Sequence, residues 1–179
     1  KPFLKERGIY FEYKDRKSYK VTLFRTILNY IRWQKGDELS LSEVKDVFEY
    51  TSTDDPPSEE RMYNLEEFGY DKNIPWYDEF TSDYEECLYI REMLSNGEEL
   101  RKDPRVKLST IHSAKGGEAD NVLLILDNTK TIRDALEKSV DKQDEEHRVW
   151  YVGVTRTKLN LYIMAAKKED QGYDIESLG

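Results

Sequence analysis

The chain has 179 residues, of which 37% are hydrophobic and 36% are charged, so it can form a core beneath a highly ionic surface. Thirteen Tyr, six Phe and three Trp residues argue against intrinsic disorder, because disordered segments contain few aromatic side chains. A single Cys excludes an internal disulfide framework, and with only two His residues it disfavours a His/Cys zinc site. No apolar run approaches the roughly 18 residues of a membrane span, so we expect a compact protein of the reducing cytoplasm.

The net charge of −9 is unevenly distributed along the chain. Residues 1–50 carry 11 basic and 8 acidic side chains, whereas residues 51–104 carry 5 basic and 16 acidic ones. Residues 105–179 are nearly balanced, with 12 basic and 13 acidic side chains. The negative net charge of the whole chain therefore does not exclude a site for a polyanion or a nucleotide near either end of the chain.

The first two thirds of the chain predict helices joined by turns. Apolar residues at three- and four-residue spacing indicate a helix over residues 18–34, and Ser-x-x-Glu capping boxes begin two more helices at Ser40 and Ser82. Trp33, Trp76 and Tyr77 could stack on bases, but we expect Trp33 in the core, whereas Trp76 lies in an acidic, Pro-containing segment that favours exposure. The remaining predictions are a strand at 9–13, an exposed linker at 53–58, and a loop with a short helix at 59–81.

The last third has a different pattern. A strand is predicted over 106–111 and a buried strand over 121–127, followed by helices around 130–140 and 143–156 and a strand at 159–165. This alternation predicts an α/β fold with a parallel or mixed sheet. We interpret the Asp-Glu-Glu-His run at 144–147 as the acidic first turn of a helix, because no buried strand precedes it to form a metal-binding box.

No phosphate-binding loop of the G-x-x-x-x-G-K-[ST] type is present, because none of the nine glycines precedes a Lys. The loop after the 106–111 strand nevertheless combines hydroxyls, an imidazole, a cation and two glycines, which can bind phosphates through side chains and backbone N–H groups. Its polar residues are Thr110, His112, Ser113 and Lys115, followed by Gly116 and Gly117. A simple polar turn explains this loop equally well.

One helix face carries Arg148, Val152 and Arg156 at four-residue spacing. An Arg near a helix C-terminus is commonly a surface charge that matches the helix dipole. The residues alone leave the role of Arg156 undecided.

Two ordered motifs resemble motifs V and VI of the UvrD/Rep/PcrA-type superfamily 1 helicases. The first is Ser-Thr-Ile-His-Ser-Ala-Lys-Gly followed by Glu118, and the second is Glu-x-x-Arg-x-x-Tyr-Val-Gly-Val-Thr-Arg with a strand after it. The resemblance covers residues 106–164 well and residues 6–34 loosely. Residues 36–104 resemble nothing assignable and fall where this family carries an insertion of variable size.

The resemblance implies a RecA-like (P-loop NTPase-type) sheet domain divided in three. Residues 1–35 and 105–179 would form the second RecA-like domain, and residues 36–104 an acidic, mostly helical insertion. ATP with Mg²⁺ would lie between this domain and the N-terminal RecA-like domain of the same protein, which supplies the phosphate loop and the metal ligands. No metal ligand is expected in this chain, and no membrane contact.

The resemblance also assigns roles to single residues. Arg156 matches the arginine finger that reaches the γ-phosphate, while Gly116 and Glu118 match positions at the ATP site, Glu118 near the ribose. Thr110 and His112 match residues on the single-stranded DNA backbone, and with Ser113 and Lys115 they form the expected DNA contact. Gly117 stands where the family usually has Leu, so we expect a more mobile loop without its apolar anchor.

Two functions are consistent with these features. The first is the C-terminal domain of a 3′→5′ ATP-dependent DNA helicase, inactive in ATP hydrolysis as an isolated fragment, with Lys1 an artificial or proteolytic start. The second is a catalytically inert helicase-fold module that acts in protein–protein interaction or regulation. A gene that extends upstream of Lys1 to a phosphate-binding loop would favour the first.

Overall fold

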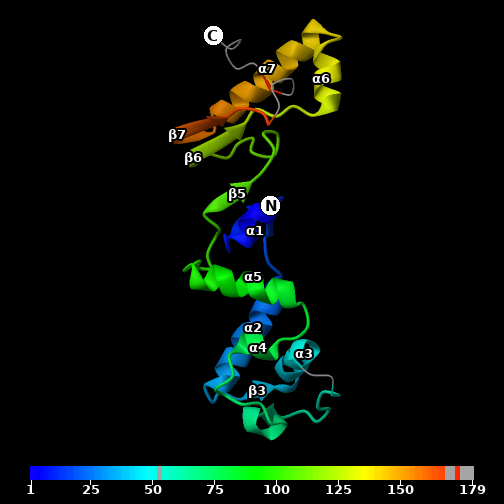
Figure 1. Cartoon of the computed structure of the whole chain (residues 1–179), viewed down its shortest axis with the longest axis vertical. Coiled ribbons are helices and arrows are strands. Elements are labelled where there is room, and N and C mark those ends of the chain that lie inside the picture. The colour runs from blue at the N-terminus through cyan, green and yellow to red at the C-terminus, as the bar shows by residue number, and fades with distance from the viewer. Residues whose placement is uncertain (52–53, 168–171, 174–179) are drawn as a thin grey trace. The chain divides into compact units, whose positions relative to one another are not determined.

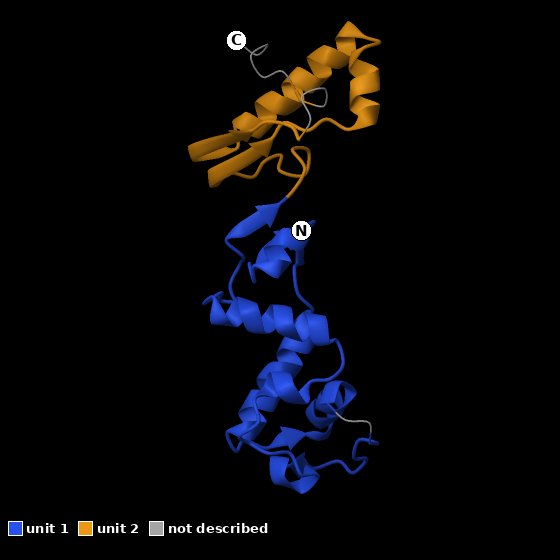
Figure 2. Ribbon diagram, viewed as in Figure 1, with its two compact units in different colours: residues 1–108 blue, residues 109–179 orange. Residues whose placement is uncertain are grey.

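The computed structural model describes residues 1–51, 54–167 and 172–173. The chain forms two compact units, residues 1–108 and residues 109–179 (Figure 2). Unit 1 contains α1 (Pro2–Glu6), β1 (Phe11–Tyr13), β2 (Arg16–Lys17), α2 (Val21–Gln34), β3 (Leu39–Ser40), α3 (Leu41–Thr51), β4 (Met62–Tyr63), the 3₁₀ helix η1 (Leu65–Phe68), α4 (Trp76–Glu79), α5 (Tyr84–Ser95) and β5 (Val106–Leu108). Unit 2 contains β6 (Ala119–Ile125), α6 (Lys130–Leu136), α7 (Val140–Val154) and β7 (Thr157–Met164) (Figure 1).

Helix α2 supplies much of the unit 1 core. Its fully buried side chains recur at three- and four-residue intervals, which places them on one face of the helix: Leu23, Ile27, Tyr30 and Trp33. The Trp33 indole N–H donates to the Tyr63 carbonyl at 2.9 Å, so its polar atom is satisfied inside the core. The predicted helix is confirmed, but Val21 is 55% exposed and does not belong to the buried face.

Aromatic side chains dominate the remainder of this core. Trp33 is buried as predicted. The prediction that Trp76 is exposed is wrong, because it begins α4 and packs edge-on against Phe80 and Tyr77. The acidic residues around Trp76 predicted that its side chain faces solvent. Burial of the large apolar indole ring outweighs the preference of these neighbours for water.

The two predicted capping boxes have different outcomes. At Ser40, the Glu43 carboxylate accepts from the Ser40 N–H at 3.0 Å, and the Glu43 N–H donates to the Ser40 hydroxyl at 3.5 Å, which confirms the first box. The box at Ser82 is wrong: α5 begins after Asp83, whose side chain makes no capping bond. Asp83 has a left-handed backbone (φ 54°), and its carboxylate forms an ion pair with Lys20 instead of capping the helix.

The segment between α3 and α5 has more structure than predicted. Residues 54–58 form no helix or strand, as expected for the linker, while Thr53 lies outside the described residues. The predicted loop with a short helix contains η1 and α4, and its β4 pairs antiparallel with β3. Two-residue strands and single helical turns are too short to produce a periodic pattern, and α1 was missed for the same reason.

The strands pair in three small sheets among the described residues. In the first, β1 lies between β2, which is antiparallel, and β5, which is parallel. In unit 2, β6 and β7 pair in parallel. The α/β class with parallel and mixed pairing is confirmed, while the RecA-like arrangement and the three-part domain division stay predictions.

In unit 2, helix α7 covers one face of the β6–β7 sheet. Leu124 and Leu126 are buried with Trp150 of α7, and Trp150 stacks on Tyr173 with ring centroids 4.8 Å apart. Most other β6 residues are exposed, so the prediction of a buried strand is wrong. The 144–147 run lies in the second turn of α7 instead of the first, because the helix begins at Val140.

Candidate functional site

The loop between β5 and β6 is closed by its own hydrogen bonds. The Thr110 hydroxyl lies 3.0 Å from the Ser113 hydroxyl and accepts from the Ser113 N–H at 3.2 Å. The Ala114 N–H donates to the Thr110 carbonyl at 3.1 Å, and the Gly117 N–H donates to the Ala114 carbonyl at 3.0 Å. These bonds form two consecutive turns, so the polar residues of the loop have a defined arrangement.

The predicted DNA-contact side chains on this loop face solvent. Thr110, His112, Ser113 and Lys115 are all exposed. Within the described residues, the side chains of His112 and Lys115 have no hydrogen-bond or ion-pair partner, so an imidazole and an ammonium group are available for a ligand. The structure brings these four residues together within six positions of one loop.

The two glycines of the loop differ in backbone conformation. Gly116 has φ +83°, in the left-handed region that side chains disfavour, although a Cβ there would meet no atom within 4 Å. Gly117 is not in that region, and a Cβ would lie 3.4 Å from the Ala114 carbonyl oxygen, which is ordinary contact. The loop therefore favours glycine at position 116 and accepts a side chain at position 117.

Gly153 of α7 packs closely against Ile111 of the loop. A Cβ at position 153 would lie 3.2 Å from Ile111 Cδ1 and 3.2 Å from Leu124 Cδ1. Sequence reasoning assigned Gly153 no separate role. The available signal was a glycine inside a predicted helix, which costs about 1 kcal/mol relative to alanine and therefore indicates a packing constraint.

Arg156 follows the end of α7 and connects the helix to the loop. Its Nε donates to the Val152 carbonyl at 3.0 Å, its Nη1 to the Gly117 carbonyl at 3.2 Å, and its Nη2 to the Thr155 hydroxyl at 3.1 Å. The Ala119 N–H donates to the Arg156 carbonyl at 2.9 Å, so the backbones are joined as well. The half-buried guanidinium is thus held beside Gly116 and Glu118.

Glu118 lies at the exit of the loop, where it forms an ion pair with Lys158 at 3.4 Å. Both side chains are more than half exposed, so this pair contributes at most about 1 kcal/mol. The Glu118 carboxylate is therefore accessible and only weakly held. All the predicted ATP-site residues of this chain, Gly116, Glu118 and Arg156, lie on this one edge of unit 2.

Arg148 differs from Arg156 in its surroundings. It is exposed on α7, and no ion pair or hydrogen bond of its side chain occurs within the residues that the structure describes. A structural ion pair was expected for Arg148; none occurs among the described residues, so this role stays a prediction.

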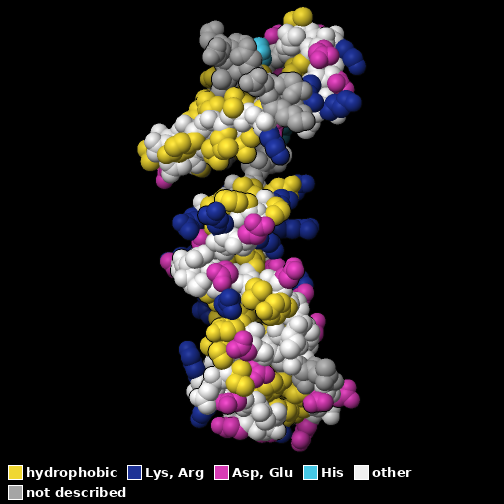
Figure 3. All heavy atoms as spheres, in the orientation of Figure 1, with side chains coloured by type: hydrophobic (Ala, Val, Ile, Leu, Met, Phe, Trp, Pro, Cys, Tyr) yellow, Lys and Arg dark blue, Asp and Glu magenta, His cyan; other side chains and the backbone are white. Residues whose placement is uncertain are grey.

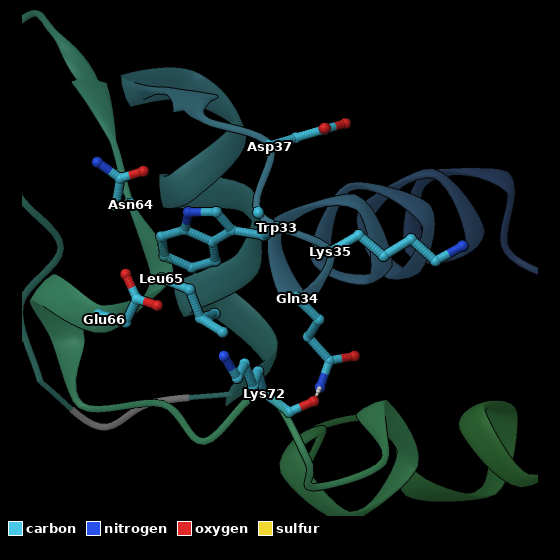
Figure 4. Close-up of a pocket in the computed structure, with 9 residues that line it drawn as sticks. Trp33, Gln34, Lys35, Asp37, Asn64, Leu65, Glu66 and Lys72 are labelled. Atoms are coloured by element: carbon cyan, nitrogen blue, oxygen red, sulfur yellow. Dashed lines mark hydrogen bonds between the residues drawn. The ribbon is translucent and has the colours of Figure 1, made fainter.

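Some features lie outside this site. A cavity of about 160 Å³ in unit 1 is lined by Trp33, Gln34, Asn64, Leu65, Glu66 and Lys72 (Figure 4), and it contains none of the predicted site residues. In residues 1–51, 54–167 and 172–173, no cluster of three or more His, Cys, Asp or Glu side chains could hold a metal ion. No helix in that same part of the chain is long and apolar enough to cross a membrane.

Comparison with known proteins places these residues in a family. The family described as the UvrD-like helicase C-terminal domain matches residues 11–168. ATP-dependent DNA helicase Rep of Buchnera aphidicola (subsp. Acyrthosiphon pisum) is 34% identical over 90 residues, which cover 47% of this chain and 13% of that protein. A probable DNA helicase II homolog of Rickettsia conorii is 36% identical over 76 residues, 39% of this chain and 11% of that protein.

The chain thus matches only about an eighth of the length of these relatives, and no solved structure matches it. The family match covers most of the chain, including the loop, Gly153 and Arg156. This chain belongs to the UvrD-like helicase C-terminal domain family.

Proposed function

We propose that the chain is the C-terminal part of an ATP-dependent DNA helicase that moves 3′→5′ along single-stranded DNA, and that Arg156 is its arginine finger. ATP is then held mainly by the N-terminal RecA-like domain of the same protein. The observation that carries the proposal is the contact of Arg156 with the loop at Gly117, which joins the two motifs at one edge of unit 2.

The hydrogen bonds of Arg156 leave it able to bind an anion. A guanidinium has five N–H groups, and three nitrogen atoms here donate one bond each, so two N–H groups remain. Their planar geometry suits two phosphate oxygens at once. A guanidinium at the γ-phosphate stabilises the charge of the transition state and raises the rate by roughly 10³–10⁵.

The neighbouring residues support a nucleotide at this edge. The accessible Glu118 carboxylate can accept hydrogen bonds from ribose hydroxyls. The left-handed backbone at Gly116 carries no side chain that would block a nucleotide there. When bound, Mg²⁺ neutralises charge on the transferred phosphoryl group. We assign none of its ligands to this chain.

Exposed groups of the same loop suit a DNA strand. The hydroxyls of Thr110 and Ser113 can donate to phosphate oxygens, and Lys115 adds a cation. Such contacts hold the backbone and carry no sequence information. Because Gly117 lies in this loop, its hydrogen bond to the Arg156 guanidinium links the nucleotide side of the site to the DNA-contact residues.

The test is turnover of the full-length protein with Arg156→Ala and Arg156→Lys. We expect kcat to fall by at least about 10² in both variants, because Lys lacks the planar fork and the contact strengthens in the transition state. Nucleotide affinity should change less. Arg148→Ala is the matched control on the same helix and should retain kcat, because its side chain has no bonded partner among the described residues. Loss of turnover in the control with normal turnover at position 156 would refute the assignment.

A further inference from the structure

Charge is segregated within unit 1. Residues 1–108 carry 18 basic and 24 acidic side chains, yet residues 1–20 alone carry seven basic and three acidic ones. In Figure 3 the Lys and Arg side chains of this unit gather over the part that carries α1 and β5. An acidic unit thus has one basic end.

Some of these cations are neutralised within the protein. Lys5 pairs with Glu86 at 2.9 Å and Lys107 with Glu12 at 3.5 Å. By contrast, Lys1, Lys14 and Arg16 have no ion-pair partner within the described part of the chain. The unpaired cations are the ones that determine what this end attracts.

Three of the cations without an ion pair, Lys1, Lys14 and Arg16, meet at the β1–β2 hairpin. Arg16 is the register partner of Tyr13 across the hairpin. The Lys1 ammonium lies 3.1 Å from the centroid of the Tyr13 ring, and the Lys14 ammonium lies 5.5 Å from it. We call Lys1, Tyr13, Lys14 and Arg16 the hairpin patch.

The two charged residues at the turn of this hairpin have an unfavourable backbone conformation. Lys14 and Asp15, its two central residues, have φ of 52° and 58°. Two-residue hairpins favour Asn-Gly at such positions, because other residues in the left-handed region are strained. Both side chains are exposed, and the Asp15 carboxylate is the single negative charge of the turn. The sequence thus keeps a Lys where a glycine or asparagine would stabilise the turn.

We propose that the hairpin patch binds the phosphodiester backbone of nucleic acid, as a contact separate from the 110–115 loop. Like charges gathered at one place repel one another, and a polyanion that bridges them removes this repulsion. The proposal rests on the proposed function only in taking DNA as the nucleic acid. An anionic membrane is a poorer fit, because α1 has five residues and lacks the long apolar face of a membrane-surface helix.

Binding by this patch depends on salt and not on base sequence. Each Lys or Arg that neutralises a phosphate adds roughly 0.7 to the salt slope for single strands and roughly 0.9 for duplexes. Removing two such contacts therefore lowers the slope by about 1.4 to 1.8 and weakens binding by at least about tenfold at low salt.

The test compares two double variants of the 179-residue chain with the same change in net charge. Lys14→Glu with Arg16→Glu alters the patch, while Lys35→Glu with Lys45→Glu alters exposed lysines at the other end of α2 and on α3. Fluorescence anisotropy measures binding of a labelled single-stranded oligonucleotide and of a duplex of the same length at several salt concentrations. Thermal melting verifies that each variant folds, and Lys14→Gln with Arg16→Gln replaces the first variant if it does not.

We expect the patch variant to lose at least about tenfold in affinity and the control to stay within about twofold. The oligonucleotide whose affinity falls more in the patch variant, single strand or duplex, is the form of DNA that the patch binds. Equal losses in both variants, no loss in either, or tighter binding to phosphatidylserine vesicles than to DNA would overturn the proposal. A failure of the proposed function is read separately, as unchanged ATP turnover of Arg156→Ala in the full-length protein.

Discussion

Gly153 is the position where one added methyl group most directly disturbs the site. It lies in α7 three residues before Arg156, and a Cβ there would lie 3.2 Å from the terminal methyl groups of Ile111 and Leu124. Ordinary contacts between carbon atoms are about 3.5–4.0 Å. Gly153→Ala therefore requires the side chains of Ile111 and Leu124, or α7 itself, to shift by a few tenths of an ångström.

Two opposing effects determine the size of the change. Alanine raises helix propensity, which stabilises the helix by about 1 kcal/mol relative to glycine. Overpacking a core contact costs about 1–3 kcal/mol, and here two methyl groups are crowded at once. We expect Gly153→Ala to lower the free energy of unfolding of unit 2 by about 1 kcal/mol and Gly153→Val to lower it further.

A double-mutant cycle with Ile111→Val provides the assay. This substitution removes Cδ1, one of the three crowded atoms, so the double variant Gly153→Ala with Ile111→Val should be more stable than the sum of the single changes predicts. Denaturant unfolding measures the coupling energy, and ATP turnover of the full-length protein reports whether Arg156 stays in place. Additive effects, or a Gly153→Ala variant more stable than the parent, would show that the close approach is not under constraint.

Three further outcomes follow from the structure. Thr110→Ala with His112→Ala in the full-length protein should weaken DNA binding or abolish DNA stimulation of ATP hydrolysis, and unchanged stimulation would contradict the loop assignment. The isolated chain should not hydrolyse ATP at several turnovers per second, which a phosphate-release assay with added DNA measures. Arg105→Ala should destabilise unit 1 by roughly 2 kcal/mol at pH 7, because it removes hydrogen bonds to the nearly buried Glu98 carboxylate, whereas Lys102→Ala, at an exposed pair, should have little effect. The Arg105 guanidinium holds the pKa of Glu98 below its usual range, so the difference between Arg105→Ala and the parent should vanish as the pH falls through that lowered pKa.

Regular spacing was enough to predict the longer helices. The apolar faces of α2 and α3 produce three- and four-residue periods, and the Ser40 capping box depends only on residues close in sequence. Predictions failed where distant contacts decide the outcome. Asp83 pairs with the distant Lys20 and makes no capping bond to α5, and the aromatic core around Trp33 encloses Trp76 despite its acidic neighbours.

The candidate site shows the same division. The polar loop was identified from its residue types, and the left-handed Gly116 agrees with a glycine-rich turn. The contact between Arg156 and Gly117 joins residues 39 positions apart, and no local pattern encodes it. Resemblance to a family indicated that both motifs serve one site, while the close packing of Gly153 against Ile111 was missed.

The apolar run of β6 illustrates why composition alone misleads about burial. A strand covered on both faces is apolar at every position, whereas a strand covered on one face alternates. Helix α7 covers the face of β6 that carries Leu124, while Leu123 and Ile125 point to the opposite face with their register partners Tyr162 and Met164, and all four are about half exposed. The sequence of β6 is thus typical of a strand with two covered faces, although unit 2 covers only one of them within the described residues. An apolar sequence indicates that a strand is suited to be covered on both faces. Whether its side chains are buried depends on which helices and strands pack against each face.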